Sequence, residues 1–266
     1  MDAALTGAAI AVHLKTHWLA RALHCFAELD STNTTARELA AAGAPHGTVV
    51  IADAQRHGRG RLGRIWVSPA RRNLYASVVL RCDVPGDRLA QVGLLAGVAV
   101  CEAVRRWCPT ALIKWPNDVL VGGRKLAGTL AELSGDAAAA RVIVLGIGVN
   151  INSAAGDFPD DLRDKATSLL LTCGAPIDRA QFAGHLLALL ERRYDSWRRD
   201  GFAPIAAAWR QLAPLIGQRI HVAEPGGAVD GTVIDLDDDG ALRLRLAAGG
   251  EYRVVAGDVT VSGGYG

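Results

Sequence analysis

Apolar residues along the first 215 positions follow two periods, and segments of the two kinds alternate. Short runs rich in β-branched residues predict strands at 48–52, 74–80, 111–115, 119–121, 124–133 and 142–152. Longer segments with apolar residues at helical spacing predict helices at 34–43, 88–107, 178–198 and 201–212. This part of the chain is therefore expected to combine a sheet with helices.

The two ends of the chain have different patterns. Residues 1–27 predict a short lead-in with a helix over 1–24, because Ile10, Leu14 and Trp18 fall at helical spacing. Beyond residue 215 the pattern predicts a small β-barrel of short alternating strands at 219–222, 228–235, 241–246, 252–255 and 259–262. We therefore expect a first domain at 1–215 and a second at 216–266.

Composition narrows the class of protein. The chain has 266 residues, half of them hydrophobic, and a formal net charge of +2, so we expect a folded protein without a DNA partner. The lead-in is also too short for a DNA-binding winged helix. Five cysteines without a C-x-x-C pair indicate a reduced, cytoplasmic protein rather than a disulfide frame. The sequence shows neither a signal peptide nor a membrane-spanning run, so no membrane association is expected.

Positive charge is concentrated in Gln55–Trp66, called the arginine loop below, which holds four arginines, three glycines and a terminal tryptophan. Because its apolar content is low, we expect it to be mobile and to gain order from an anionic ligand. Arginine offers planar donors to phosphate or carboxylate, and Trp66 offers a face for a base. Its G-x-G-x-x-G pattern does not indicate a dinucleotide fold, because the next residues are polar and broken by Pro69.

Two further features are candidates for binding, and each has a structural alternative. Ser31 and Thr32 stand where the helix near residue 34 begins, so they either cap that helix or bind a ligand at its N-terminus. Gly146 and Gly148 alternate in a strand and face the same side. Their missing side chains leave either a ligand slot or room for a closely packed helix.

Two lysines flank a strand end that is broken by Pro116. Lys114 precedes the proline and Lys125 follows a glycine turn, with Asp118 between them. We expect both lysines in strands that pair across this hairpin. An exposed lysine can serve solubility alone, but two lysines and an aspartate gathered at one strand end favour a functional role.

Together these motifs resemble those of the biotin protein ligases. Four blocks carry the resemblance in the family's order and spacing: Asp30–Asn33, Gln55–Trp66, Lys114–Asp118 with Arg124–Gly128, and Gly146–Asn150. The resemblance covers residues 28–266. It implies an α/β (α+β) fold with a central mixed sheet flanked by helices, similar to class II aminoacyl-tRNA synthetases, and a C-terminal SH3-like β-barrel. Because the family's DNA-binding domain has no counterpart here, we expect the ligase-only type.

The resemblance also implies an activity and its residues. ATP, with Mg²⁺ held mainly by its phosphates, and biotin would form biotinyl-5′-AMP, and a lysine of a biotin carboxyl carrier protein would then take the biotin. The implied catalytic residues are Lys125, Arg61 and Asp118. The implied biotin-binding residues are Ser31, Thr32, Asn33, Gln55, Gly58, Arg59, Arg61, Lys125, Gly128, Gly146 and Gly148. The implied nucleotide-binding residues are Arg59, Arg61, Arg64, Trp66, Lys114, Asn117, Asp118, Lys125 and Asn150.

Two other functions stay open on the sequence alone. A lipoate or octanoate ligase or transferase would share the fold, although a transferase needs an activated cysteine and Cys173 has no lysine or histidine placed to activate it. A non-catalytic biotin sensor that regulates transcription would need a winged helix. We expect a monomer or weak homodimer that acts on a carrier subunit of acetyl-CoA carboxylase or a similar enzyme.

Overall fold

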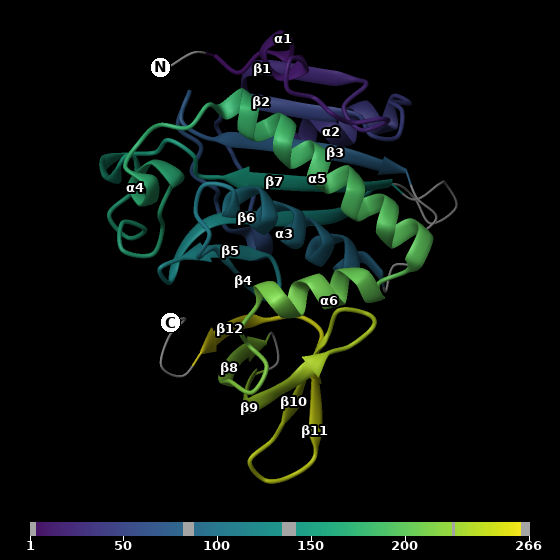
Figure 1. Ribbon diagram of the computed structural model, residues 1–266, viewed down its shortest axis with the longest axis vertical. Helices are drawn as coiled ribbons and strands as arrows, with labels where there is room; N and C mark the ends of the chain where they lie inside the picture. Colours follow the sequence, from purple (N-terminus) through teal and green to yellow (C-terminus); the bar gives the residue numbers. More distant parts are fainter. Residues whose placement is uncertain (1–3, 82–87, 135–141, 225–226, 262–266) are drawn as a thin grey trace.

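The computed structural model describes residues 4–81, 88–134, 142–224 and 227–261. Its first unit is built on a seven-stranded sheet in the order β1-β2-β3-β7-β6-β5-β4 (Figure 1). β1 runs parallel to β2 and every other neighbouring pair is antiparallel, which confirms the expected mixed sheet. The strands are β1 (Leu23–Leu29), β2 (Val49–Gln55), β3 (Leu74–Arg81), β4 (Leu112–Lys114), β5 (Asp118–Val121), β6 (Arg124–Ser134) and β7 (Val142–Val149).

Helices cover both faces of this sheet (Figure 1). Val49 and Ile51 of β2 belong to the main core with α3 and α5, whereas Val50 between them belongs to a smaller core with α2. A strand covered on both faces has a continuous apolar run, as the sequence shows. The helices are α1 (Gly7–Ala11), α2 (Thr32–Ala41), α3 (Leu89–Arg105), α4 (Leu169–Cys173), α5 (Arg179–Asp200) and α6 (Ala203–Leu212).

The short helix α2 covers only part of its face of the sheet. Its ten residues contact β2, β3 and β7. The rest of that face, over β5 and β6, lies beside the arginine loop, which joins β2 to β3 and contains one short 3-10 turn, η1 (Arg61–Gly63). The helix layer therefore leaves an opening over the middle of the sheet, and the candidate site lies in that opening.

The C-terminal unit is a five-stranded antiparallel sheet in the order β11-β10-β9-β8-β12. Its strands are β8 (Arg219–Glu224), β9 (Gly227–Leu236), β10 (Leu242–Arg245), β11 (Glu251–Val254) and β12 (Asp258–Val261). They match the five expected strands, while closure into a barrel stays a prediction. The indole N–H of Trp115 donates to the Gly240 carbonyl at 3.1 Å, so this sheet is anchored to the first unit near β4.

The prediction of a helix over residues 1–24 is wrong, because the helix found there is much shorter. α1 covers only Gly7–Ala11, and the chain then turns. Glu191 of α5 accepts hydrogen bonds from the backbone N–H groups of His17, Trp18 and Leu19 at 2.7–2.9 Å. A carboxylate from a distant helix thus satisfies donors that a continued helix would otherwise satisfy. The apolar pattern does not reveal β1 either, because this edge strand is half-exposed along most of its length.

The strands that carry Lys114 and Lys125 do not pair with each other, contrary to the sequence-based expectation. β4, with Lys114, and β6, with Lys125, lie on opposite sides of β5 and both pair with it. The turn at Pro116 reverses the chain, so that Asp118 lies opposite Lys114. Two successive hairpins therefore replace the single hairpin that the glycine turn suggested.

Neither a disulfide nor a membrane span is present in the part of the chain that the structure describes. Cys25, Cys101, Cys108 and Cys173 are free, and Cys82 lies outside the described residues. No helix there combines the length and the apolar character needed to cross a bilayer.

A buried ion pair joins α5 to the sheet and generates a stability prediction. Arg179 donates to Asp53 at 2.8 Å with both side chains 6% exposed, and the Leu5 backbone N–H donates to the same carboxylate. Arg179→Ala should lower the free energy of unfolding by about 3–5 kcal/mol, because it leaves a buried carboxylate without its cation. Urea denaturation measures this. Arg199→Ala, which breaks an exposed pair with Asp200, is the control and should leave the midpoint unchanged. Equal midpoints for the two variants would contradict the argument.

Candidate active site

A cavity of about 530 Å³ opens between the arginine loop and the uncovered face of the sheet. Its volume is in the range of small-molecule and cofactor sites. It brings together nearly all residues that the sequence analysis singled out, and these are Ser31, Thr32, Asn33, Gln55, Arg59, Arg61, Arg64, Trp66, Lys114, Asn117, Asp118, Lys125, Gly128, Gly146, Gly148 and Asn150. Gly58 is the exception: it lines a neighbouring hollow beneath the loop.

The alternating glycines of β7 make room for protein side chains. A Cβ atom on Gly148 would lie 2.5 Å from the ring of Trp66, and one on Gly146 would lie 2.4 Å from the side chain of Asn33 on α2. The sequence left open whether these glycines form a ligand slot or allow close helix packing, and the two glycines differ in this respect. Gly146 permits close helix packing, and Gly148 permits the indole of Trp66 to lie flat at the cavity wall.

The arginine loop has more internal anchoring than its composition suggests. The backbone N–H of Trp66 donates to the Gly58 carbonyl at 2.9 Å, and that of Gly60 donates to the Arg64 carbonyl at 2.8 Å. A Cβ atom on Gly58 would lie 2.3 Å from the Trp66 carbonyl, so only glycine permits this crossing. The low apolar content of the loop therefore does not leave it without contacts, because backbone hydrogen bonds join its own residues.

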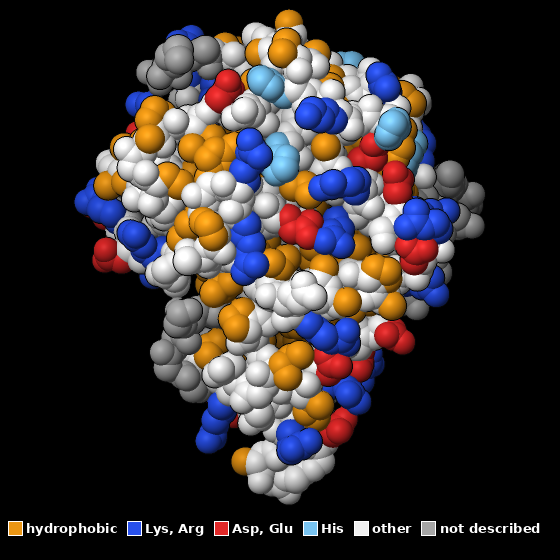
Figure 2. Space-filling model, viewed as in Figure 1, with side chains coloured by type: hydrophobic (Ala, Val, Ile, Leu, Met, Phe, Trp, Pro, Cys, Tyr) orange, Lys and Arg blue, Asp and Glu red, His pale blue; other side chains and the backbone are white. Residues whose placement is uncertain are grey.

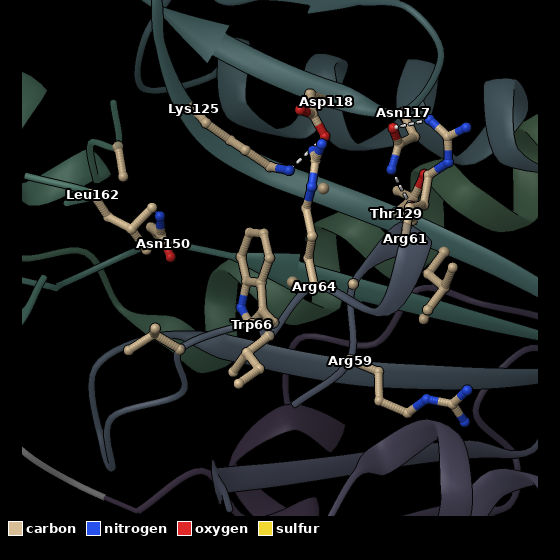
Figure 3. Close-up of a pocket in the computed structure, with 18 of the residues that line it drawn as sticks. Arg59, Arg61, Arg64, Trp66, Asn117, Asp118, Lys125, Thr129, Asn150 and Leu162 are labelled. Carbon is tan, nitrogen blue, oxygen red and sulfur yellow. Dashed lines mark hydrogen bonds and ion pairs between the residues drawn. The ribbon is translucent and has the colours of Figure 1, made fainter. Parts of the chain in front are cut away.

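Three arginines of the loop end in different surroundings (Figure 3). Arg59 points away from the other labelled residues and pairs with Glu132 at 2.8 Å, and Arg64 pairs with Asp258 of β12. Arg61 donates to the neutral side chain of Asn117 at 3.2 Å, and no carboxylate of the described residues lies within ion-pair distance of it. Burial lowers the pKa of the Arg61 guanidinium from its usual value. Arg61 is thus a partly buried cation without a direct counter-ion.

Lys125 faces Asp118 across the top of the cavity (Figure 3). Its ammonium lies 2.7 Å from the Asp118 carboxylate and 5.4 Å from the centre of the Trp66 ring. The backbone of Lys125 is held on its other side by the segment after β7, through bonds of 2.8 Å to the Lys165 carbonyl and the Thr167 N–H. The lysine is therefore fixed at both its backbone and its charged end.

Polar side chains from α2, β2 and β3 form a hydrogen-bonded group at the edge of the cavity. The side-chain oxygen of Gln55 accepts from the Thr32 backbone N–H at 2.8 Å. The buried Ser77 hydroxyl lies 2.8 Å from the Thr32 hydroxyl and 2.6 Å from the side-chain amide oxygen of Asn33. Ser77 has one proton and can donate to only one of these at a time. Ser31 stands at the helix N-cap without a capping bond from its side chain.

Two amides expected to contact nucleotide hold protein segments in place. Asn117 donates to the Thr129 carbonyl at 2.6 Å while its oxygen accepts from Arg61. Asn150 donates to the Thr167 carbonyl at 3.0 Å, and its backbone N–H donates to the Leu126 carbonyl. Asn150 therefore ties the segment after β7 to the start of β6.

The sequence analysis missed several residues of the site. The missed lining residues include Thr129, Leu130, Phe158, Leu162, Asp164, Lys165, Ala166 and Asp258. A serine inside the apolar run of β3 was an available signal for Ser77, because a polar residue in a strand covered on both faces needs partners. Asp258 carries no such signal, since only the folded chain brings β12 to the arginine loop.

The described residues do not form a complete metal site. No group of three or more His, Cys, Asp or Glu side chains there could hold an ion. The carboxylates that line the cavity are Asp118, Asp164 and Asp258. Mg²⁺ typically keeps its waters and binds one or two carboxylates plus substrate phosphates, so this set fits an ion that arrives with phosphate.

Comparisons with known proteins place the chain among enzymes that activate biotin. Residues 25–150 match the biotin/lipoate A/B protein ligase family, and residues 215–262 match the biotin protein ligase C terminal domain. The chain is 42% identical over 247 residues to the biotin–[acetyl-CoA-carboxylase] ligase of Mycobacterium tuberculosis, which covers 90% of this chain and 88% of that protein. It is 39% identical over 237 residues to the bifunctional ligase/repressor BirA of Bacillus subtilis, or 89% of this chain and 73% of that protein.

A solved structure agrees with the sequence matches. The biotin protein ligase of Aquifex aeolicus in complex with biotin and ATP superposes with a TM-score of 0.78 at 28% identity. The match covers 91% of this chain and 99% of that one. The mixed sheet, its helices and the C-terminal sheet therefore follow the fold of that ligase.

The contact between Gly148 and Trp66 generates a packing prediction. Gly148→Ala should lower the free energy of unfolding by about 1–3 kcal/mol, because the added methyl group overpacks the slot that the indole occupies. Gly97→Ala is the control: its Cβ would meet nothing within 4 Å on helix α3, so it should raise stability by about 0.5–1 kcal/mol. Urea denaturation compares them. A Gly148→Ala protein as stable as the wild type would show that the indole is not held there.

Proposed function

We propose that this chain, which belongs to the biotin protein ligase family, is an ATP-dependent biotin–protein ligase. In the first step the biotin carboxylate attacks the α-phosphorus of ATP, the bond to the β-phosphate oxygen breaks, and biotinyl-5′-AMP and pyrophosphate form. In the second step a carrier lysine attacks the acyl carbon, an amide bond forms, and AMP leaves. The relatives that carry this activity in their names align over most of the chain.

The observation that carries the proposal is that two cations from different elements, Arg61 of the arginine loop and Lys125 of β6, line the same cavity. Both substrates are anions, so their mutual repulsion must be offset by cations fixed near the reacting oxygens. Arg61 is partly buried, and among the described residues its side chain bonds to the neutral Asn117 and to no carboxylate. An anion in the cavity would compensate that charge, whereas Arg59 and Arg64 already have carboxylate partners.

The proposed catalytic roles follow from this arrangement. Arg61 and Lys125 stabilise the charge that develops on the phosphoryl oxygens and hold the biotin carboxylate. Asp118 orients the Lys125 ammonium, 2.7 Å away, and lies where it can also face an incoming lysine amine. Closure of the arginine loop excludes water, which would hydrolyse the mixed anhydride.

The proposed biotin site lies where α2 begins. Ser31, Thr32 and Gln55 offer hydroxyl and amide groups to the ureido ring, with backbone groups of Gly58 and Arg59 beside them. Thr32 and Gln55 already bond to each other at 2.8 Å, so a ligand meets side chains whose orientation is set. The remaining proposed wall residues are Asn33, Gly128, Gly146 and Gly148.

The proposed nucleotide site lies toward β4 and β5. Trp66 stacks on adenine, Asn117 contacts its edge, and Lys114 and Arg64 face the phosphates. For Arg64 this requires exchange of Asp258 for phosphate. Asn150, which lines the cavity, is proposed to contact the nucleotide, and its side chain also donates to the Thr167 carbonyl.

Magnesium is proposed as the ion that enters with ATP. It neutralises charge on the pyrophosphate leaving group when bound. Asp118 is the described carboxylate best placed to meet it, because that side chain lines the cavity beside Lys125. The ion is held mainly by the phosphates.

The partner is proposed to be a biotin carboxyl carrier protein, and the protein is proposed to act in the cytoplasm as a monomer or weak homodimer. We keep 1–215 and 216–266 as the proposed catalytic and C-terminal domains. Basic and acidic side chains are intermingled over the face of α5, α6 and the C-terminal sheet (Figure 2). That face therefore offers no broad basic field to a nucleic acid.

The same family includes lipoate ligases, and two observations favour biotin. Residues 215–262 match the C-terminal domain of biotin protein ligases. Cys173, the candidate transferase nucleophile, does not line the cavity and donates to the Trp107 carbonyl at 3.4 Å. Pyrophosphate release with biotin, and not with lipoate, tests the assignment directly.

Removal of Lys125 tests the proposed chemistry. Lys125→Ala should lower the rate of biotin-dependent pyrophosphate release by about two to four powers of ten, because it removes a charge that stabilises the transition state. The far-ultraviolet circular dichroism spectrum should not change. Lys15→Ala, at an exposed lysine outside the cavity, is the matched control. Near-wild-type turnover of Lys125→Ala at saturating substrates would show that another residue supplies the charge.

Removal of Arg61 tests retention of the intermediate. Arg61→Gly should still allow some adenylate to form but should release it, so that exposed lysines on an added bystander protein become biotinylated. Blotting with streptavidin compares the bystander with the carrier. Arg56→Gly is the control in the same loop, since Arg56 pairs with Glu28 and Asp30 outside the cavity. Labelling restricted to the carrier, from an Arg61→Gly protein that forms adenylate, would refute the closure role.

A further inference from the structure

Glu132 on β6 accepts from donors on two different parts of the chain. Its Oε1 accepts from Arg59 of the arginine loop at 2.8 Å. Its Oε2 accepts from Asn33 at 2.8 Å and from Arg37 at 3.2 Å, both on α2. The carboxylate therefore links the arginine loop to the helix whose N-terminus borders the cavity. The proposed chemistry gives Glu132 no role.

This link extends as a series of side chains to the other end of the loop. From Asn33 the series continues through Ser77 and Thr32 to Gln55, with neighbouring polar atoms 2.6–3.1 Å apart. Gln55 donates to the Ser68 hydroxyl at 2.9 Å, and Ser68 donates to the Trp66 carbonyl at 3.0 Å. Arg59, near the start of the loop, and Trp66, at its end, are thus held by one connected network.

We infer that Glu132 is a positioning residue that fastens the arginine loop over the ligand by fixing Arg59 to α2. The burial of the network supports this, because Thr32, Asn33 and Ser77 are each less than 5% exposed and their bonds compete little with water. Charge supports it too, since Glu132 compensates Arg59 and so reduces repulsion inside a loop with four arginines. Glu132 touches no reacting atom and acts through Arg59 and Asn33.

Because the two carboxylate oxygens of Glu132 accept from different donors, we expect substitutions of Glu132 to have graded effects. Glu132→Ala removes both acceptors and leaves Arg59 and Asn33 without them. Glu132→Gln keeps one acceptor oxygen and replaces the other with a donor, so its effect should lie between wild type and Glu132→Ala. Arg37→Ala leaves the bond to Arg59 intact and should have little effect on the loop.

A comparable ion pair on the opposite face of the sheet provides the matched control. Glu102 on α3 accepts from Arg193 on α5, and both side chains are about as exposed as that of Glu132. Glu102→Ala breaks this pair without touching the cavity, so it reports what the loss of a half-buried pair does to the fold alone.

Amide hydrogen exchange tests the inference in the protein without ligands. Exchange at Gly60 and Trp66, whose amides are bonded inside the loop, should be on the order of tenfold faster in Glu132→Ala than in wild type, the expected loss for one charge-assisted hydrogen bond. Glu102→Ala should leave exchange at both amides unchanged. Equal exchange in the two variants overturns the inference, and this test does not depend on the enzyme being active.

A second measurement rests on the proposed function. With biotin, MgATP and carrier, the ratio of released adenylate to biotinylated carrier should rise on the order of tenfold in Glu132→Ala and by less in Glu132→Gln. A wild-type protein that releases no pyrophosphate with biotin would refute the proposed function, and the exchange result would still decide the role of Glu132. An active wild type with the same ratio in Glu132→Ala and Glu102→Ala would overturn the positioning role.

Discussion

The structure depends on holding several positively charged side chains around one cavity. Three arginines of the arginine loop, Arg59, Arg61 and Arg64, and Lys125 of β6 line one cavity. Like charges at such distances repel, and the repulsion grows as water is excluded. The chain offsets this with separate acids from different elements: Asp118 of β5 for Lys125, Glu132 of β6 for Arg59, and Asp258 of β12 for Arg64. Each of these three ion pairs neutralises a positive charge and also fixes the orientation of the side chain that carries it.

Arg61 is different, and the difference explains why the cavity suits anions. Burial disfavours its charged form, and its side chain bonds to a neutral amide. Asp118 and Asp258 act on Arg61 only at a distance, so an anion that enters the cavity could form the direct ion pair that no described carboxylate forms with it. Arg64 and Lys125, in contrast, must exchange or share a carboxylate when phosphate binds. The site thus combines Arg61, which forms no ion pair with a described carboxylate, with Arg64 and Lys125, which are held in position until a ligand replaces or shares their partners.

Much of the site could be predicted from the sequence, because its residues lie in short motifs at element ends. The strands around Lys125 and the glycine strand follow from apolar runs and turns that local propensities specify. What could not be predicted depends on distant contacts. Near residue 18 the chain forms turns instead of the predicted helix, because Glu191 accepts hydrogen bonds from its backbone. Asp258 and Glu132 hold the arginine loop, whose own composition suggests disorder. The composition of a segment indicates only the structure that the segment would adopt in isolation. The carboxylates that hold these two segments come close to them only after the chain has folded.

The two glycines of β7 make room for two different side chains. Gly146 admits Asn33, whose amide passes the constraint from Glu132 to Ser77, and Gly148 admits the indole of Trp66. A side chain at either position would displace a residue of the network that holds the arginine loop: Asn33 within the network or Trp66 at its end. The glycines are therefore needed even where no ligand touches them. The shape of the cavity and the position of the loop follow from one packing constraint, so a change at either glycine should alter both together.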